Sequence, residues 1–521
     1  MIDTVIVGGG LCGLALAADL ERNGQSYRLF EARERLGGRV LTIKPENHAA
    51  MDLGPAWFWP EIHPRVTRLV SELGLISFPQ HDQGQVLRIK DADGKLENLG
   101  ENPVHNGAMR LRGGMQALIE AFAKIVPAEK IEFNQVLVSI KDKGDYVLVG
   151  FDSDIGSEIV NARRVVVAIP PRLIAENLQL TPELDSELMR TLSETPTWMA
   201  GEAKAVIGFE KAFWRDQGLS GNGFAHHEQA VLGELYDACD PDAQHAAIGG
   251  FFALGVAQRE SFKLGMPMLI NSELVQLFGS EAEHGAQHYQ DWATERFTCS
   301  TLDREPPSEH PEYANPLLSQ TYWDGKLLFG SSESARYGGG YLEGALEAAS
   351  RLFAQIVQIA LSSANRERIE GFRNWALSRK SSAFEDYQRR LNTRLSKHQI
   401  DQLTQLSLLE TVEKVYSDAL LQLDSNPLDV QGSTVRDGRS EFTPWMLTVF
   451  NGFNDELLDQ ALKFNRTSCA LSNFPFEHVL SEEYVQTIRQ DLRAAWRNFA
   501  LSVNSRLIRE STCAQVTYEA A

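Results

Sequence analysis

The sequence predicts an α/β fold for roughly the first 370 residues and an all-α domain for the rest. Strand-like and helix-like segments alternate in the first part, and the apolar run over 165–169 is typical of a strand buried in a parallel sheet. Glycine marks the division, because residues 371–521 hold only four of the forty glycines. These observations indicate a doubly wound, Rossmann-like sheet followed by helices.

Composition limits the function classes. A length of 521 residues suggests about three domains, and 43% apolar with 23% charged residues is ordinary for a globular protein. The net charge of −20 disfavours a nucleic-acid partner. Five cysteines without a C-x-x-C pair argue against a disulfide framework and a zinc site, so we expect no metal and a reducing cytoplasm. We expect neither a signal peptide nor a membrane-spanning helix, because the sequence contains no run of 18 apolar residues.

The N-terminal segment predicts a dinucleotide site. A strand over 4–7 leads into the G-x-G-x-x-G glycines Gly8, Gly10 and Gly13, and a helix over 14–22 follows. Gly8 permits the tight turn, Gly10 lets the backbone approach a pyrophosphate, and Gly13 lets the helix pack closely on the strand. The helix N-terminus then offers amide donors to the phosphates.

Two further features extend this site. The next strand, over 27–30, ends at Glu31, where a carboxylate accepts hydrogen bonds from ribose hydroxyls. Arg33 begins a segment that continues to Gly38 and Arg39, and two glycines before an arginine allow close backbone approach with a cation for phosphate. A nicotinamide site would not need this second element.

From Val5 to Val40 the chain resembles the FAD-binding start of the flavin amine oxidase family, which includes monoamine and polyamine oxidases. Later segments resemble the remaining motifs of that family in order, up to about residue 360. The resemblance implies cofactor contacts from Gly54, Ala56 and Trp57 in 52–57, Val136, Ala168 in 168–171, Ser332 and Glu333 in 329–333, and Tyr341, Leu342 and Ala345 in 340–345. Residues 112–115 resemble the middle signature.

The resemblance also implies two interleaved domains. We expect a discontinuous FAD-binding domain and a mixed-sheet α+β substrate domain over the flavin, with the all-α domain appended. The expected FAD segments are 1–75, 108–195 and 293–365, the substrate segments are 76–107 and 196–292, and the helical domain is 371–521.

Three residues are expected in catalysis. By resemblance, Lys204 holds a water against flavin N5, Tyr341 forms one wall of the amine site, and Trp292 borders the isoalloxazine. The competing interpretation of Lys204 is a surface lysine at a strand edge. The second tyrosine of the monoamine oxidase cage aligns with Leu302, which puts a full aromatic cage in doubt.

Other aromatic residues are more ambiguous. Of Trp57, Phe58 and Trp59, we expect one to line the cofactor site and the others to pack in the core. Core packing is also the preferred interpretation of Tyr236 and Phe251.

The cofactor is expected to be non-covalent FAD. The cysteine that carries the flavin in monoamine oxidases aligns with Thr301, and Cys299, two residues away, is the alternative covalent link.

By resemblance, the substrate is a small amine whose carbon next to nitrogen gives a hydride equivalent to flavin N5. The imine hydrolyses, and molecular oxygen reoxidises the flavin to yield hydrogen peroxide. One alternative is an amino-acid oxidase or a biosynthetic FAD dehydrogenase or desaturase on the same scaffold. Another is a flavin-stabilised binding protein that acts through its helical domain. For residues 371–521 we expect a cover over the cavity entrance or a homodimer contact.

Overall fold

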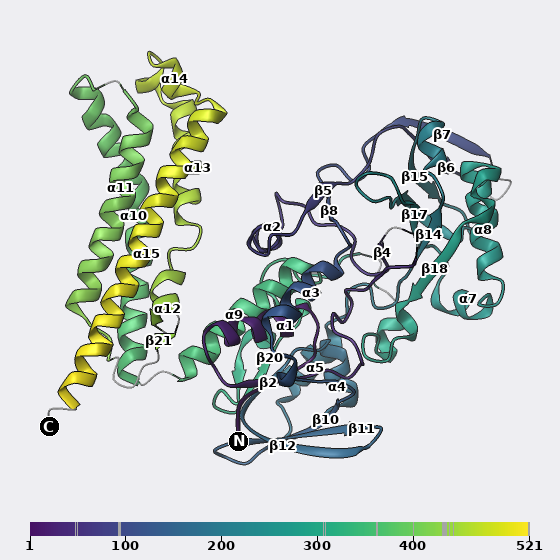
Figure 1. Ribbon diagram of the computed structural model, residues 1–521, viewed down its shortest axis with the longest axis horizontal. Helices are drawn as coiled ribbons and strands as arrows, with labels where there is room; N and C mark the ends of the chain where they lie inside the picture. Colours follow the sequence, from purple (N-terminus) through teal and green to yellow (C-terminus); the bar gives the residue numbers. More distant parts are fainter. Residues whose placement is uncertain are drawn as a thin grey trace. The chain divides into compact units, whose positions relative to one another are not determined.

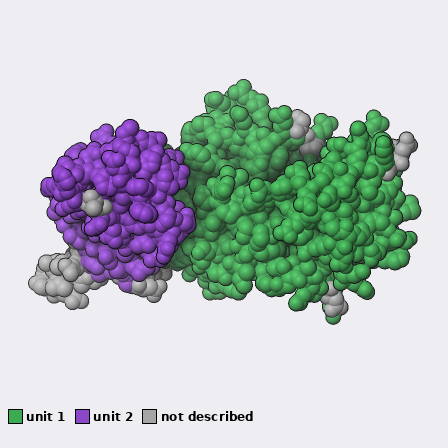
Figure 2. Space-filling model, turned by 90° about the horizontal axis from the view of Figure 1, so that it is seen from above, with its two compact units in different colours: residues 1–356 green, residues 357–521 purple. Residues whose placement is uncertain are grey.

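The computed structural model describes residues 1–46, 48, 50–91, 95–305, 307, 309–360, 363–399, 401–429, 435–436, 438–440 and 442–518. The chain divides into two compact units, residues 1–356 and 357–521 (Figure 2). The expected border at 371 lies inside helix α10 (Ser363–Ser396), so the drop in glycine content falls within a continuous helix.

The first unit contains the predicted doubly wound sheet (Figure 1). Strands β2, β1, β12 and β20 lie side by side and parallel, which places their carboxyl ends at one edge. The sheet order is β13-β10-β11-β12-β1-β2-β9, and β20 joins β12 and β19. The strands are β1 (Ile2–Val7), β2 (Tyr27–Phe30), β9 (Ile131–Glu132), β10 (Val136–Asp142), β11 (Val147–Ser153), β12 (Gly156–Val167), β13 (Gln179–Thr181), β19 (Thr321–Tyr322) and β20 (Leu327–Phe329).

Apolar side chains explain these strands. Val5, Val7, Phe30, Val165 and Val167 are buried in one core cluster, as expected for central parallel strands. The apolar run over 165–169 leaves the sheet after Val167, because Pro171 begins the next helix. The helices of this unit are α1 (Leu11–Arg22), α2 (Pro64–Glu72), α3 (Gln116–Ile125), α4 (Pro171–Asn177), α5 (Ser186–Glu194), α6 (Phe213–Asp216), α7 (Val256–Ser261), α8 (Met266–Phe278) and α9 (Leu342–Ala360), which ends beyond the unit border.

A second, mixed sheet of seven strands has the order β18-β14-β17-β16-β15-β6-β7. Only the β6–β15 pair is parallel. Alternation on β14 sends Ala205 and Ile207 into the core with α8, whereas Lys204 and Val206 point to the opposite face. The strands are β6 (Gln85–Ile89), β7 (Leu96–Glu101), β14 (Ala203–Phe209), β15 (Leu219–Ala225), β16 (Leu232–Asp237), β17 (Ala246–Phe252) and β18 (Ala286–Asp291).

Two small hairpin-like pairs complete this unit. They are β3 (Thr42–Ile43) with β4 (Met51–Asp52), and β5 (Ser77–Pro79) with β8 (Met109–Leu111).

The second unit is helical, as predicted. Ser481 caps α15 by accepting a hydrogen bond from the Tyr484 amide at 3.2 Å, and Ile488 and Leu492 are buried on the expected face. Among the described helices, none is long and apolar enough to cross a bilayer. The elements are α10, α11 (Leu403–Ser425), α12 (Thr443–Thr448), α13 (Phe453–Thr467), α14 (Pro475–His478) and α15 (Glu482–Tyr518), with the short pair β21 (Val435–Arg436) and β22 (Arg439–Ser440).

Candidate active site

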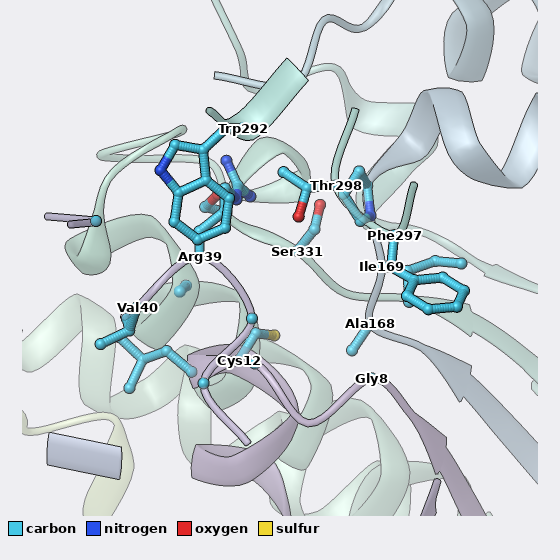
Figure 3. Close-up of a pocket in the computed structure, with 18 of the residues that line it drawn as sticks. Gly8, Cys12, Arg39, Val40, Ala168, Ile169, Trp292, Phe297, Thr298 and Ser331 are labelled. Atoms are coloured by element: carbon cyan, nitrogen blue, oxygen red, sulfur yellow. The ribbon is translucent and has the colours of Figure 1, made fainter. Parts of the chain in front are cut away.

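A cavity of about 900 Å³ lies in the first unit (Figure 3). Its walls come from the carboxyl ends of β1, β2 and β12, from the face of the mixed sheet that carries Lys204, and from the segments around Trp292 and Tyr341. Most residues expected to contact the cofactor line it: Gly8, Gly10, Glu31, Arg33, Gly38, Arg39, Gly54, Ala56, Trp57, Val136, Ala168, Trp292, Ser332, Tyr341, Leu342 and Ala345.

The three motif glycines have different surroundings. Gly8 has a φ of +106°, and an added Cβ would lie 2.5 Å from the Ala168 carbonyl oxygen. A Cβ on Gly13 would lie 2.0 Å from the Gly8 carbonyl oxygen, so Gly13 serves helix packing and does not line the cavity. A Cβ on Gly10 would meet nothing within 4 Å. Of these three glycines, Gly10 alone has open space where a side chain would lie, next to amides at the start of α1 that have no partner within the helix.

Glu31 is fixed at the end of β2. Its carboxylate accepts hydrogen bonds from the Gly9 amide at 2.7 Å and from the Arg33 amide at 2.9 Å. The Arg33 guanidinium donates to Glu295 at 3.0 Å and to Thr298 at 2.8 Å. These contacts place one anion and one cation on the cavity wall in set orientations.

Glu333 lies behind the wall instead of on it. It is 0% exposed and pairs with both terminal nitrogens of Arg39, at 2.7 and 3.0 Å. Burial opposes ionisation, but the Arg39 guanidinium outweighs this effect and lowers the pKa of Glu333. Arg39 and Ser332 line the cavity, so Glu333 is connected to the cavity wall through Arg39.

Lys204 lies on an inner strand, so the interpretation as a strand-edge surface lysine is wrong. Its side chain is buried, and Nζ donates to the Gly54 carbonyl at 2.9 Å. Three ring centroids, of Phe251, Tyr236 and Trp57, lie 5.1, 5.2 and 5.5 Å from Nζ. Burial lowers the pKa of Lys204 to about 7, an effect that Asp52 partly opposes.

Trp292 and Tyr341 both line the cavity. The Trp292 indole is buried and donates to the Leu53 carbonyl at 3.0 Å. Tyr341 is 40% exposed, and its ring stacks on His310 at 4.7 Å and lies 6.4 Å from Trp198.

Leu302 is 58% exposed, and it does not line the cavity. Two rings on the cavity wall neighbour Tyr341: the His63 imidazole at 5.6 Å and the Trp198 indole at 6.4 Å, and both come from other segments. Sequence reasoning missed Trp198, and its only signal is a tryptophan six residues before Lys204.

Cys299 is half-buried, and its thiol donates to the Ser300 carbonyl at 3.4 Å. It does not line the cavity, although Thr298 beside it does. Burial raises the pKa of Cys299 to about 11 and that of Cys12, which lines the cavity near Gly8, to about 12 (Figure 3). Neither thiol is therefore prone to ionise.

Other lining residues were missed or assigned to the core. Phe251 and Trp59 line the cavity, whereas Phe58 is buried and pairs with Met109 through its backbone. The remaining missed residues include His63, Met199, Glu202, Phe297 and Thr298.

Comparison with known proteins identifies the family of this chain. The family described as flavin containing amine oxidoreductase matches residues 96–356, and the NAD(P)-binding Rossmann-like domain matches residues 6–73. The chain belongs to the flavin-containing amine oxidoreductases. As a member of this family it is a flavoprotein with FAD as cofactor.

Individual relatives of this oxidoreductase are distant. Amine oxidase [flavin-containing] A of Sus scrofa is 23% identical over 71% of the chain and 87% of the relative. Amine oxidase [flavin-containing] B of Cavia porcellus is 24% identical, over 68% and 86%. A variant of putrescine oxidase shares the fold with a TM-score of 0.57 at 20% identity, over 68% and 98%. Cyclohexylamine oxidase from Brevibacterium oxydans has a TM-score of 0.57 at 18%, over 68% and 99%.

The cavity of this oxidoreductase fits FAD. The open space beside Gly10 suits a pyrophosphate, and the Glu31 carboxylate suits ribose hydroxyls. Arg39 adds a cation to the cavity wall, and Trp292 and Lys204 add an indole ring and a buried amine. The residues present thus match the anionic, sugar and ring portions of the cofactor.

Proposed function

We propose that this oxidoreductase oxidises a small amine. The observation that carries the proposal is the buried Lys204 ammonium, which lines the cavity and is enclosed by three aromatic rings. When bound, FAD would supply two-electron redox chemistry, with the carbon next to the amine nitrogen as the source of the hydride equivalent and oxygen as the final electron acceptor. Hydrogen peroxide is the product that we expect.

The aromatic walls select the reactive form of the amine. Tyr341, Trp198, Trp57 and Phe251 line the cavity with rings, and the last two lie beside Lys204. Transfer of an ammonium into such surroundings is costly, so the neutral amine, which has a free lone pair, is favoured. Burial raises the pKa of Tyr341, which keeps its phenol neutral while the ring orients the substrate.

Lys204 holds or releases one proton near neutral pH. Its charged form favours negative charge that develops beside it, and Nζ orders a water in the cavity. The Gly54 carbonyl, in the loop after β4, accepts the hydrogen bond from Nζ and so fixes its position.

Two of the three arginines on the cavity wall are already paired with carboxylates of the protein. Arg33 and Arg39 are committed to Glu295 and Glu333. The third, Arg296, lies over the Phe297 ring at 4.4 Å and forms no ion pair among the described residues. An arginine with free donors is what a substrate carboxylate requires, so an amino-acid substrate is the alternative that the amine panel tests.

We also propose that FAD is bound without a covalent link, because Cys299 lies off the cavity wall and Cys12 has a raised pKa. Acid denaturation of the holoenzyme should release flavin into the supernatant. Flavin retained in the protein precipitate would contradict this.

Rapid mixing of the anaerobic holoenzyme with a panel of primary and secondary amines tests the function. We expect at least one amine to bleach the flavin band near about 450 nm. Lys204→Met should slow flavin reduction or reoxidation, whereas Lys211→Met, at a largely exposed lysine just beyond the same strand, should change neither. Stoichiometric FAD that no amine reduces would instead favour a binding protein acting through its helical unit.

A further inference from the structure

Trp57 has a second, buried partner outside the cavity. Its indole lines the cavity on the Lys204 side and stacks on the His105 imidazole, with ring centroids 4.5 Å apart and planes at 28°. The indole nitrogen donates to the Gln80 side chain at 2.8 Å. Tyr236 packs edge-on against the same indole at 4.5 Å. The wall beside Lys204 is thus held by contacts that the proposed chemistry does not use.

His105 is itself fixed by two carboxylates. It is 6% exposed; its amide donates to Asp82 at 2.8 Å, its Nδ1 lies 3.3 Å from Asp82 and its Nε2 lies 3.2 Å from Glu234. A neutral imidazole carries one N–H, so only the imidazolium can donate to both carboxylates. Burial favours the neutral ring, but the hydrogen bonds to Asp82 and Glu234 outweigh it and raise the pKa of His105.

The mixed sheet connects His105 to Lys204 by strand register. Glu234 on β16 pairs with Phe251 on β17, and Phe251 pairs with Lys204 on β14. Directly paired residues point to the same face of a sheet, so these three side chains form one row across it. Glu234 therefore ties the imidazole to the row that carries the ammonium.

We propose that His105 is a positioning residue that holds the Trp57 indole beside Lys204 and keeps bulk solvent, beyond the single ordered water, from the ammonium. The proposal rests on the role assigned above to Lys204. Without the imidazole, the indole loses the ring stacked on it and the Asp82 and Glu234 carboxylates lose their shared donor. The indole can then rotate, and bulk solvent reaches Nζ.

The predicted consequence is a change in the titration of Lys204. The charged groups that influence its Nζ are Asp52, Arg110 and Glu234. Since burial is the main cause of its lowered pKa, admission of water raises that pKa toward its ordinary value. Loss of the positive charge of His105 also raises the pKa of Lys204. The experiment must therefore separate the effect of Trp57 movement from the direct electrostatic effect of removing that charge.

The experiment measures reoxidation of chemically reduced holoenzyme by oxygen between about pH 6 and pH 9, which requires no amine substrate. In the native protein, we expect the reoxidation rate to change with pH around a midpoint near the pKa of Lys204. In Lys204→Met, this pH dependence should disappear. His105→Ala should raise the midpoint by about one pH unit. His105→Gln, which restores a donor to a carboxylate, should shift it less. His226→Ala, at an exposed histidine after β15, is the matched control and should leave it unchanged.

A double-mutant cycle with Trp57→Leu separates the two routes. If His105 acts through the indole, His105→Ala causes no further shift once Trp57 is replaced. An equal shift in both backgrounds, or no shift in either, would overturn the proposal. If His105→Ala fails to bind FAD, His105→Gln takes its place in the cycle. A flavin that no amine reduces would refute the proposed function while leaving this result unaffected.

Discussion

Removal of the Glu333 carboxylate should strongly lower the free energy of unfolding of the first unit, which carries the cofactor cavity. Glu333→Gln preserves shape but leaves the Arg39 guanidinium without its counter-ion. Loss of one member of a buried ion pair costs about 3–5 kcal/mol. Arg39 keeps hydrogen bonds to the Trp198 carbonyl and the Ser332 hydroxyl, both at 3.0 Å, so we expect the lower end, about 3 kcal/mol.

Urea unfolding of the holoenzyme, followed by release of FAD fluorescence, is the assay. With a slope of about 3 kcal/mol per molar urea, the midpoint should fall by about 1 M. Glu120→Gln, at a half-exposed ion pair with Lys44 in the same unit, is the control and should not move it measurably. A shift for Glu333→Gln as small as that of the control would refute the reasoning.

The Arg39–Glu333 ion pair also makes the stability of the protein depend on pH. Because the folded-state pKa of Glu333 is lowered, its contribution is complete above the unfolded-state pKa and is lost as pH falls through the folded-state value. The native protein should therefore lose more stability on acidification than Glu333→Gln does.

Three further predictions follow from the site. Gly10→Ala should leave the thermal stability of the apoprotein nearly unchanged but weaken FAD binding. Gly13→Ala should lower both the thermal stability and the affinity for FAD, because its Cβ would overlap the Gly8 carbonyl. Differential scanning calorimetry of the two apoproteins, together with titration with FAD, compares them. The folded-state pKa of Lys204 is about 7 against an ordinary 10.5, so native stability should rise with pH across this interval, and Lys204→Met should abolish that rise in urea titrations. Trp198→Leu should lower kcat/KM for the best amine by about tenfold without FAD loss, and unchanged kinetics would exclude Trp198 from the substrate wall.

Local sequence patterns predicted the dinucleotide end of the site well. The β1–loop–α1 segment is continuous in sequence, so the roles of Gly8 and Gly13 and the position of Glu31 follow from spacing alone. Glu333 was found by its motif, but its partner Arg39 lies almost 300 residues away in sequence, and no local pattern indicates that pairing.

The rings around Lys204 could not be assigned from the sequence, because their positions depend on strand register, which a single sequence does not specify. Phe251 resembles an ordinary core residue until β17 pairs with β14 and sets it beside Lys204. The glycine drop at 371 differs from the division between the compact units for another reason. Gly371 faces open space on α10, and one exposed glycine costs a helix only about 1 kcal/mol, so the helix continues through it.

The interleaving of the two sheets restricts how the protein can fold during synthesis. The doubly wound sheet needs β20, whose residues follow β1 by more than 300 positions, and β18 of the mixed sheet emerges only shortly before β20. Neither sheet can close while the ribosome is still translating the first half of the chain, so unpaired strand edges stay exposed for most of elongation. A nascent chain that stops before residue 329 should capture no FAD, and we expect folding in the cell to depend on chaperones that shield these edges.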